Sequence, residues 1–252
     1  MYHLAIENFY ANTIDHSDVL QLLETAATTE GRPRDMARGR LYRRLFPAYQ
    51  AIKADIPLQL QFYLPDGTSF LRFHKPDRYG DPLLGFQNSV RLANEQKQPV
   101  HGFETGKVRS GFRYVYPLLQ DKRHLGSIAA SVTAKGIRDA LAKLDPNREY
   151  AFLLNLNLTQ PHIFPEQQWL YSPADIHPGY LIEDANAILP DSPPKLSDEA
   201  TAINRRLRND PGVQKAMSQG LPRDHPCQRQ RHVAHRVIAP HPGCGEARPP
   251  VT

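Results

Sequence analysis

The sequence predicts an α+β fold built on antiparallel sheets, and three observations support this. Residues 1–56 carry helical patterns of apolar residues, and the strand-like runs that follow come in pairs across short polar turns. No strand leads through a Gly-rich turn into a helix, so a parallel dinucleotide-binding fold is unsupported. Helices before and between such hairpins predict an antiparallel sheet with helices on one face.

The N-terminal region predicts helices separated by one clear break. Residues 1–30 read as two helical stretches, and Gly31 with Pro33 ends the second. A longer helix follows over 37–52, where apolar residues recur about every four positions. Pro47 is expected to kink or restart this helix.

Hairpins dominate the middle of the chain. Residues 58–74 alternate apolar and polar side chains around the turn Pro65-Asp66-Gly67-Thr68 and predict the first hairpin. A helix over 84–96 and a short strand over 99–104 follow. Two strong strands over 111–118 and 124–132 then form a second hairpin, and 133–144 reads as a helix.

Beyond Asp145 the pattern starts again and predicts a second small module. Residues 150–158 and 167–171 read as strands, and 175–188 stay ambiguous. Residues 198–219 read as a helix interrupted near Pro211.

Composition limits the classes of partner. The 252-residue chain has a net charge of +5, of which the Pro/Arg/His-rich segment 221–252 carries +3. The remaining body is nearly balanced, so no nucleic-acid partner is expected. No run of about 18 apolar residues and no signal peptide occurs, so we expect no membrane contact by this chain itself.

Polar residues gather around the first hairpin and the strands after it. Arg72, His74 and Asp81 lie within ten residues of one another, and Glu104 and Arg113 follow on neighbouring strands. One hypothesis is catalytic, with His74 as a general base oriented by Asp77 or Asp81. No nucleophile, phosphate loop or metal-ligand spacing accompanies these residues, so no catalytic residue, metal or cofactor is expected.

Two other interpretations of this cluster stay open. In the first, strand-borne arginines clamp a ligand carboxylate, and aromatic residues wall the pocket. Those aromatic residues are Tyr63, Phe73, Phe112, Tyr114 and Tyr116. In the second, Arg72 and Arg113 pair with Asp81 and Glu104 only to fix the loops between strands.

The C-terminal segment also holds metal-ligating residue types. They are His225, Cys227, His232, His235, His241 and Cys244. Structural zinc sites use paired knuckles such as C-x2-C, and here each cysteine stands alone. We therefore expect a disordered, metal-free tail.

Several motifs occur in a characteristic order. They are LRFHKPDRYGD (71–81), GFETG (102–106), GFRYVYPL (111–118) and HLGSIAASV (124–132). In this the sequence resembles the double Cache family of bacterial extracytoplasmic sensor domains, which precede diguanylate cyclase, phosphodiesterase, histidine kinase or chemoreceptor modules. The resemblance spans about residues 5–220.

The resemblance implies a long N-terminal helix followed by two PAS-like α/β modules, the second of them incomplete. It implies a small-molecule ligand, a carboxylate being one candidate, bound in the first module. The residues expected around that pocket are Arg72, His74, Asp81, Glu104, Arg113, Tyr114 and Tyr116. The expected division is 1–56 helical segment, 57–145 membrane-distal module, 146–220 partial second module and 221–252 disordered tail.

These expectations lead to a sensory ligand-binding module, not an enzyme. The alternatives are a structural or dimerising module without a ligand, or a non-functional fragment. The family implies an inner-membrane protein whose sensor faces the periplasm, whereas this chain as written would stay in the cytoplasm. Either the chain is a fragment, or its start is placed late and its reading frame changes near Leu221; we favour the second, and a stand-alone binding protein is a further alternative. Homodimerisation through the N-terminal helices is a further expectation.

Overall fold

The computed structural model describes most of the chain. The described residues are 2–85, 87–104, 110–163, 165–183 and 196–219. The chain divides into two compact units, Met1–Ala140 and Leu141–Thr252. The segment 221–252, with the disorder and the His/Cys set predicted for it, lies outside the described residues.

The first unit opens with the predicted helices. Helix α1 (Tyr2–Phe9) continues into a π-helical turn (Tyr10–Ile14), and α2 (Ser17–Thr28) and α3 (Arg32–Asp55) follow. Gly31 separates α2 from α3 with φ +61°, a backbone conformation that suits glycine. The predicted break between 30 and 33 is therefore confirmed.

The restart predicted at Pro47 is wrong, because α3 continues past it to Asp55. A proline removes one N–H from the helical ladder and leaves the carbonyl four residues earlier without a partner. Pro47 and Arg43 are both exposed, so solvent can hydrate that carbonyl.

A five-stranded antiparallel sheet follows the helices. Its strands are β1 (Leu58–Tyr63), β2 (Ser69–Arg72), β3 (Val100–Glu104), β4 (Gly111–Gln120) and β5 (Arg123–Thr133). They lie in the order β2-β1-β5-β4-β3, and α4 (Asn88–Gln96) connects β2 to β3. Both predicted hairpins are confirmed.

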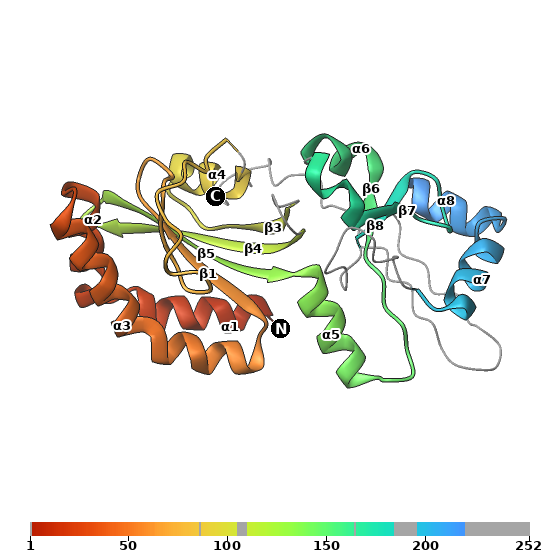
Figure 1. The fold of residues 1–252 in the computed structure, drawn as a ribbon, viewed down its shortest axis with the longest axis horizontal. Coiled ribbons are helices and arrows are strands. Elements are labelled where there is room, and N and C mark those ends of the chain that lie inside the picture. The colour runs from red at the N-terminus through yellow and green to blue at the C-terminus, as the bar shows by residue number, and fades with distance from the viewer. Residues whose placement is uncertain (1, 86, 105–109, 164, 184–195, 220–252) are drawn as a thin grey trace, which may run out of the picture. The chain divides into compact units, whose positions relative to one another are not determined.

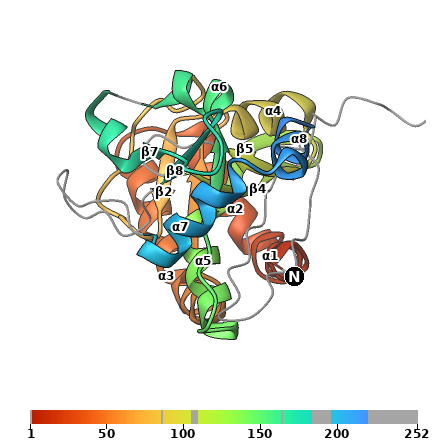
Figure 2. The same cartoon turned by 90° about the vertical axis from the view of Figure 1, so that its right-hand side faces the viewer.

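Helices cover both faces of this sheet (Figure 1). Leu60 and Phe62 of β1 pack into the core formed with α1, α2 and α3, whereas Tyr63 packs with Val90 of α4 on the other face. Figure 2 shows α4 and α1 on opposite sides of β4 and β5. The expectation of helices on one face only is wrong, because β1, β4 and β5 carry apolar side chains on both faces.

The second unit begins within α5 (Ala134–Leu144). Its antiparallel sheet has the order β6-β8-β7, with β6 (Leu153–Asn155), β7 (Tyr171–Pro173) and β8 (Tyr180–Glu183). The helices are α6 (Leu156–Thr159), α7 (Asp198–Leu207) and α8 (Pro211–Gln219), with 3₁₀ turns at Gln160–His162 and Pro165–Leu170. The predicted break at Pro211 is confirmed.

Two predicted strands of this unit are largely wrong. The strand expected over 150–158 is reduced to β6, because the Asn155 side chain accepts a hydrogen bond from the Leu158 N–H and starts α6. The strand expected over 167–171 is mostly a 3₁₀ helix, in which the Trp169 indole N–H donates to the Glu166 carbonyl at 2.8 Å. Local side-chain hydrogen bonds override the apolar pattern in both places.

In the part of the chain that the structure describes, no helix combines the length and the apolar character needed to cross a lipid bilayer.

Candidate functional site

The candidate site lies on the face of the five-stranded sheet that α4 covers, called here the α4 face. Strand register places three of the predicted residues on it. Arg72 lies opposite Gln61 on β1, Arg113 lies opposite Gly102, and Glu104 is diagonal to Arg113 across β3 and β4. The side chains of Arg72, Glu104 and Arg113 are all largely buried.

Arg72 ends β2 and holds the loop that follows it. Its guanidinium lies 2.6 Å from the Asp81 carboxylate and donates to the Arg78 carbonyl at 2.7 Å. The Arg72 side chain is 13% exposed, whereas that of Asp81 is 57% exposed. A largely buried cation therefore has its carboxylate partner at the surface.

Backbone hydrogen bonds fix the position of Asp81. The Ser69 N–H donates to the Asp81 carbonyl at 2.9 Å, and the Gly80 N–H donates to the Ser69 carbonyl at 2.8 Å. Gly80 has φ +90°, a conformation that favours glycine at this turn. The loop consequently returns along β2 and presents the Asp81 carboxylate to Arg72.

The second ion pair is enclosed and has further bonds. Arg113 Nε lies 2.9 Å from Glu104 Oε2, and the two side chains are only 12% and 15% exposed. The Glu104 carboxylate also accepts the Ser89 N–H at 3.1 Å and the Ser89 hydroxyl at 2.8 Å. Ser89 lies in the first turn of α4, so this pair fastens the helix N-terminus to the sheet.

Tyr63 lies within electrostatic range of both ion pairs. Burial raises the pKa of its hydroxyl to about 12, against the opposing effects of Arg113, the Gln87 side chain and Arg72. The hydroxyl is therefore neutral and can donate a hydrogen bond at physiological pH.

Several buried polar atoms on this side have no hydrogen-bond partner within the described residues. Ser127 lies opposite Tyr63 on β5 and its hydroxyl is fully buried, while Asn94 is on the buried side of α4 with both amide atoms unpaired. A buried unpaired polar group costs about 1–3 kcal/mol. A polar ligand or ordered water would recover part of that cost.

His74 lies in the turn after β2 and is neutral. Burial, with the positive charges of Lys75, Arg72 and Lys53, lowers the pKa of its ring to about 4. Its Nδ1 atom is buried and has no partner in the described part of the chain, so no carboxylate orients the ring. This arrangement does not support the catalytic hypothesis for His74, whereas a hydrogen bond to a ligand remains available to it.

The structure does not bring all seven predicted residues together. Tyr114 lies beside His3 and His101, and Tyr116 stacks on Tyr10 at 4.3 Å between ring centroids. Both tyrosines face α1, α2 and α3, on the side of the sheet away from α4. Consecutive residues of a strand face opposite ways, and Arg113 faces α4. Arg113 therefore lies on the α4 face while its neighbour Tyr114 does not.

Other residues of the α4 face were not among the predicted site residues. They are Gln61, Ser69, Ser89, Asn94 and Ser127, whereas Tyr63 on the same face was expected as an aromatic wall of the pocket. Gln61 donates to the Ser69 hydroxyl at 3.0 Å, and both side chains are buried. The alternation of Gln61 and Tyr63 with Leu60 and Phe62 was the available signal for a polar face.

The two ion pairs are those of the structural interpretation: Arg72 with Asp81 and Arg113 with Glu104. The two pairs differ in exposure: the Asp81 carboxylate of the first pair is open to solvent, whereas both side chains of the second pair are enclosed. No group of three or more His, Cys, Asp or Glu side chains within the described residues is placed to hold a metal ion.

Comparison with protein families gives one match. Residues 37–143 match the family described as the double sensory domain of two-component sensor kinase. These residues are thus similar to the double Cache sensory family. The match begins in α3, includes all five strands of the first sheet and ends in α5, and it confirms the resemblance found in the sequence.

Solved structures similar to this chain include sensor domains of bacterial receptors. They include the sensor domain of the Vibrio cholerae histidine kinase DctB, with 16% identity, a TM-score of 0.40, and 52% of this chain and 49% of that chain covered. The ligand-binding domain of the Campylobacter jejuni chemoreceptor Tlp3 with 4-methylisoleucine has 12% identity, a TM-score of 0.43, and 62% and 60% covered.

The Tlp3 sensory domain with isoleucine bound has 14% identity, a TM-score of 0.43, and 62% and 61% covered. The chain thus spans between about half and three fifths of the length of these three domains. No curated protein matches it.

Proposed function

We propose that the α4 face binds a small molecule carrying a carboxylate, and that the double Cache module reports its presence to a signalling output. The observation that carries the proposal is the Arg72–Asp81 pair, in which a 13% exposed guanidinium has a 57% exposed partner. A ligand carboxylate can approach from solvent and take the place of Asp81 on Arg72. Bidentate bonds between guanidinium and carboxylate are among the stronger protein contacts.

Arg72 is a better anchor than Arg113. Glu104 holds Arg113 and two donors of Ser89 at once, so displacing it would release the N-terminus of α4. Displacing Asp81 frees only a surface carboxylate. We therefore assign Arg72 to the ligand, and Arg113 with Glu104 to positioning α4 above it.

Other groups near Arg72 or on the α4 face suit a zwitterionic ligand. The displaced Asp81 carboxylate can accept an ammonium group, and the neutral His74 Nδ1 can accept a hydrogen bond. Asn94 and Ser127 supply further unpaired polar atoms. An α-amino acid or a hydroxy acid combines these features, and amino acids are the ligands in the Tlp3 structures.

The signalling step would be a shift in the population of two arrangements of the N-terminal helices. Strand β4 links the two sides, because Arg113 faces α4 while Tyr114 and Tyr116 contact residues of α1 and its π-helical turn. A ligand that moves α4 or β4 would change how α1 packs. The proposal makes the chain a sensor without catalytic activity.

The remaining expectations from the sequence are proposals as well. They are the domain boundaries at 56, 145 and 220, a homodimer, and the attachment of the module to an output domain in an inner-membrane protein. The whole receptor's output and partners are proposed only as those of a bacterial sensor.

A thermal-shift screen of the full chain tests the proposal. The panel consists of the common L-amino acids, C3–C6 mono- and dicarboxylates, and uncharged amides of the same acids. We expect at least one carboxylate to raise the melting temperature and its amide to have no effect. If no carboxylate shifts the melting temperature, or if amides act equally well, the proposal is wrong.

A further inference from the structure

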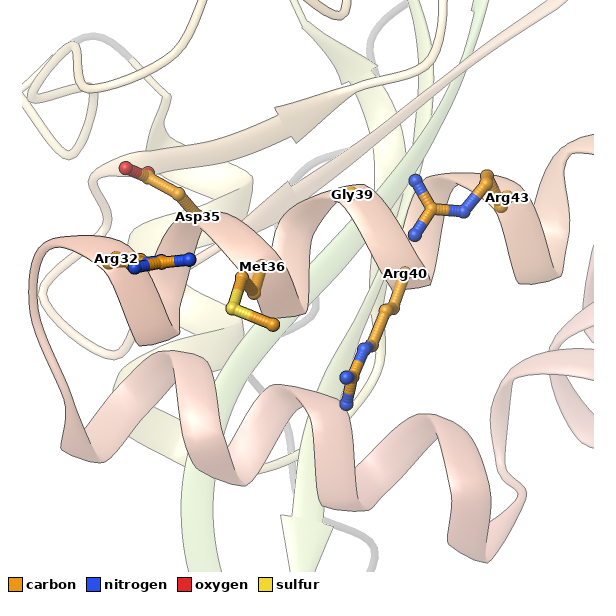
Figure 3. A pocket seen from close by; sticks show the side chains of 6 residues that line it. All are labelled: Arg32, Asp35, Met36, Gly39, Arg40 and Arg43. Atoms are coloured by element: carbon orange, nitrogen blue, oxygen red, sulfur yellow. The ribbon is translucent and has the colours of Figure 1, made fainter.

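A second surface of the first unit lies on α3, away from the α4 face. Six residues of this one helix line a hollow of about 410 Å³ (Figure 3). They are Arg32, Asp35, Met36, Gly39, Arg40 and Arg43. Ala37, Leu41 and Leu45 occupy the buried side of the same helix, so the hollow is on its solvent side.

The charge of this hollow is strongly positive. Arg32, Arg40 and Arg43 have no acidic partner among the described residues, whereas the other arginines of α3 each have one. Those pairs are Arg34–Glu30, Arg38–Asp35 and Arg44–Asp18. Because Arg38 already neutralises Asp35, three unpaired guanidinium groups remain around the hollow.

The three arginines form an extended array. Arg32 and Arg43 are eleven residues apart, which corresponds to about 16 Å along a helix. Between them Met36 is 48% exposed, and Gly39 has no side chain. The Arg43 guanidinium lies next to Gly39, 3.6 Å from where a methyl group at that position would stand. Glycine inside a helix costs about 1 kcal/mol relative to alanine, and here it keeps the hollow open.

We infer that this hollow binds a small polyphosphate anion. A linear polyphosphate carries several negative charges along an extended chain, so it can contact all three guanidinium groups, and arginine is well suited to phosphate. A single carboxylate would neutralise only one of them. The volume lies within the range of small-molecule sites, about 300–1,000 Å³.

Other occupants fit less well. A second copy of this helix face would bring three positive charges against three. An acidic helix, with a diameter of about 10 Å, would need far more space than 410 Å³ along this length. Three acids of helix α2 and the turn after it, Asp18, Glu24 and Glu30, are already paired with arginines. We therefore take the anion to be a separate molecule.

Isothermal titration of the full chain with sodium tripolyphosphate tests this inference, at low ionic strength and again with added salt. The variant Arg32→Gln/Arg40→Gln/Arg43→Gln is expected to bind at least tenfold more weakly. The control Arg91→Gln/Arg123→Gln/Arg148→Gln removes the same charge from arginines that have acidic partners. It is expected to bind within about twofold of the unaltered chain.

A second variant keeps every charge. Gly39→Leu fills the hollow and favours the helix, so it is expected to weaken tripolyphosphate binding at least fivefold without lowering the melting temperature. Titration with ATP, ADP and inorganic phosphate shows whether the bound phosphate groups belong to a nucleotide or to free polyphosphate. Both sources satisfy the inference, provided that inorganic phosphate binds at least tenfold more weakly.

Several outcomes would overturn the inference. They are no binding of tripolyphosphate, equal loss of binding in the test and control triple variants, and unchanged binding by Gly39→Leu. Binding to vesicles of phosphatidylcholine with 30% phosphatidylserine that tripolyphosphate does not displace would favour a membrane surface instead. None of these results depends on Arg72, so they leave the proposal for the α4 face untouched.

Discussion

Arg72 and Asp81 form an ion pair of 2.6 Å that is open on one side, because the guanidinium is largely buried and the carboxylate is largely exposed. A ligand that replaces Asp81 supplies another carboxylate, so the charge of Arg72 stays paired. The enclosed Arg113–Glu104 pair on the same face has the opposite character. This difference underlies the assignment of one arginine to the ligand and the other to the framework.

Asp81→Asn should strengthen binding of a ligand whose only charge is a carboxylate. The ligand then no longer competes with a native carboxylate for Arg72, and we expect an affinity gain of about three- to tenfold. Titration calorimetry on an acid found in the screen measures it. Asp77→Asn removes an exposed charge from the same loop and should have no effect. Equal gains in the two variants would mean that general charge, not competition at Arg72, is responsible.

Glu104→Ala should destabilise the first unit strongly. It leaves Arg113 buried without its carboxylate and removes both bonds to Ser89, which corresponds to about 3–5 kcal/mol. Ser89→Ala removes only the hydroxyl bond and should cost about 0.5–1.5 kcal/mol. Urea denaturation measures both losses of unfolding free energy. A loss below about 1 kcal/mol for Glu104→Ala would contradict the role given to this pair.

The double variant Glu104→Ala/Arg113→Met checks the cause of that loss. Removing the arginine charge together with its partner should recover part of the stability that Glu104→Ala loses, because no unpaired charge remains. If the double variant is less stable than Glu104→Ala, the unpaired guanidinium is not the cause of the stability that Glu104→Ala loses.

His74 should make stability depend on pH in a defined window. Its folded pKa of about 4 lies below the ordinary value of 6.5, so between these values the unfolded chain binds more protons. The contribution of a neutral His74 is therefore complete above pH 6.5 and is lost as the pH falls towards 4. The loss is on the order of 1–2 kcal/mol, because the ring stays partly solvated.

The measurement is the difference in unfolding free energy between the unaltered chain and His74→Gln, taken from pH 7.5 to 4.5. Taking the difference removes the contribution of carboxylates that titrate in both proteins. We expect His74→Gln to gain relative stability as the pH falls. A difference that stays constant across this range would contradict a buried, neutral His74.

Tyr10 and Tyr116 should respond in opposite ways to loss of the hydroxyl group. The Tyr10 hydroxyl donates to the Pro117 carbonyl at 3.2 Å, so Tyr10→Phe should cost about 0.5–1.5 kcal/mol. The Tyr116 hydroxyl is buried and has no partner within the described residues, so Tyr116→Phe should be neutral or stabilising. Thermal denaturation of the two variants checks this. A larger loss of stability for Tyr116→Phe than for Tyr10→Phe would contradict the view that only the Tyr10 hydroxyl has a partner.

The sequence predicted the first sheet well because its signals are local. Leu58, Leu60 and Phe62 alternate with Gln59 and Gln61, and a Pro-Asp-Gly turn follows, so strand and turn were both visible. In the described part of the second unit the strands are only three or four residues long. Patterns that short cannot be distinguished from turns, and the Asn155 cap decided the structure there.

The site was only partly visible in the sequence. The pairing of Arg72 with Asp81 and of Arg113 with Glu104 was one of the two interpretations left open. The alternation of side chains along β4 already implied that Arg113 and Tyr114 face opposite sides, so one pocket could not include both. The bond from Ser89 to Glu104 joins residues fifteen positions apart, and only the packing of α4 on the sheet reveals it.

The binding of a ligand carboxylate by Arg72 is best tested with the thermal-shift panel on the unaltered chain, Arg72→Gln and Arg91→Gln. Arg91 is an exposed arginine of α4 paired with Glu95, so its variant controls for charge. A ligand at ten times its Kd adds about 1.4 kcal/mol, or a shift of about 3–5 °C. We expect this shift with at least one carboxylate in the unaltered chain and in Arg91→Gln, and its loss in a folded Arg72→Gln. The same shift in Arg72→Gln would contradict carboxylate binding by Arg72.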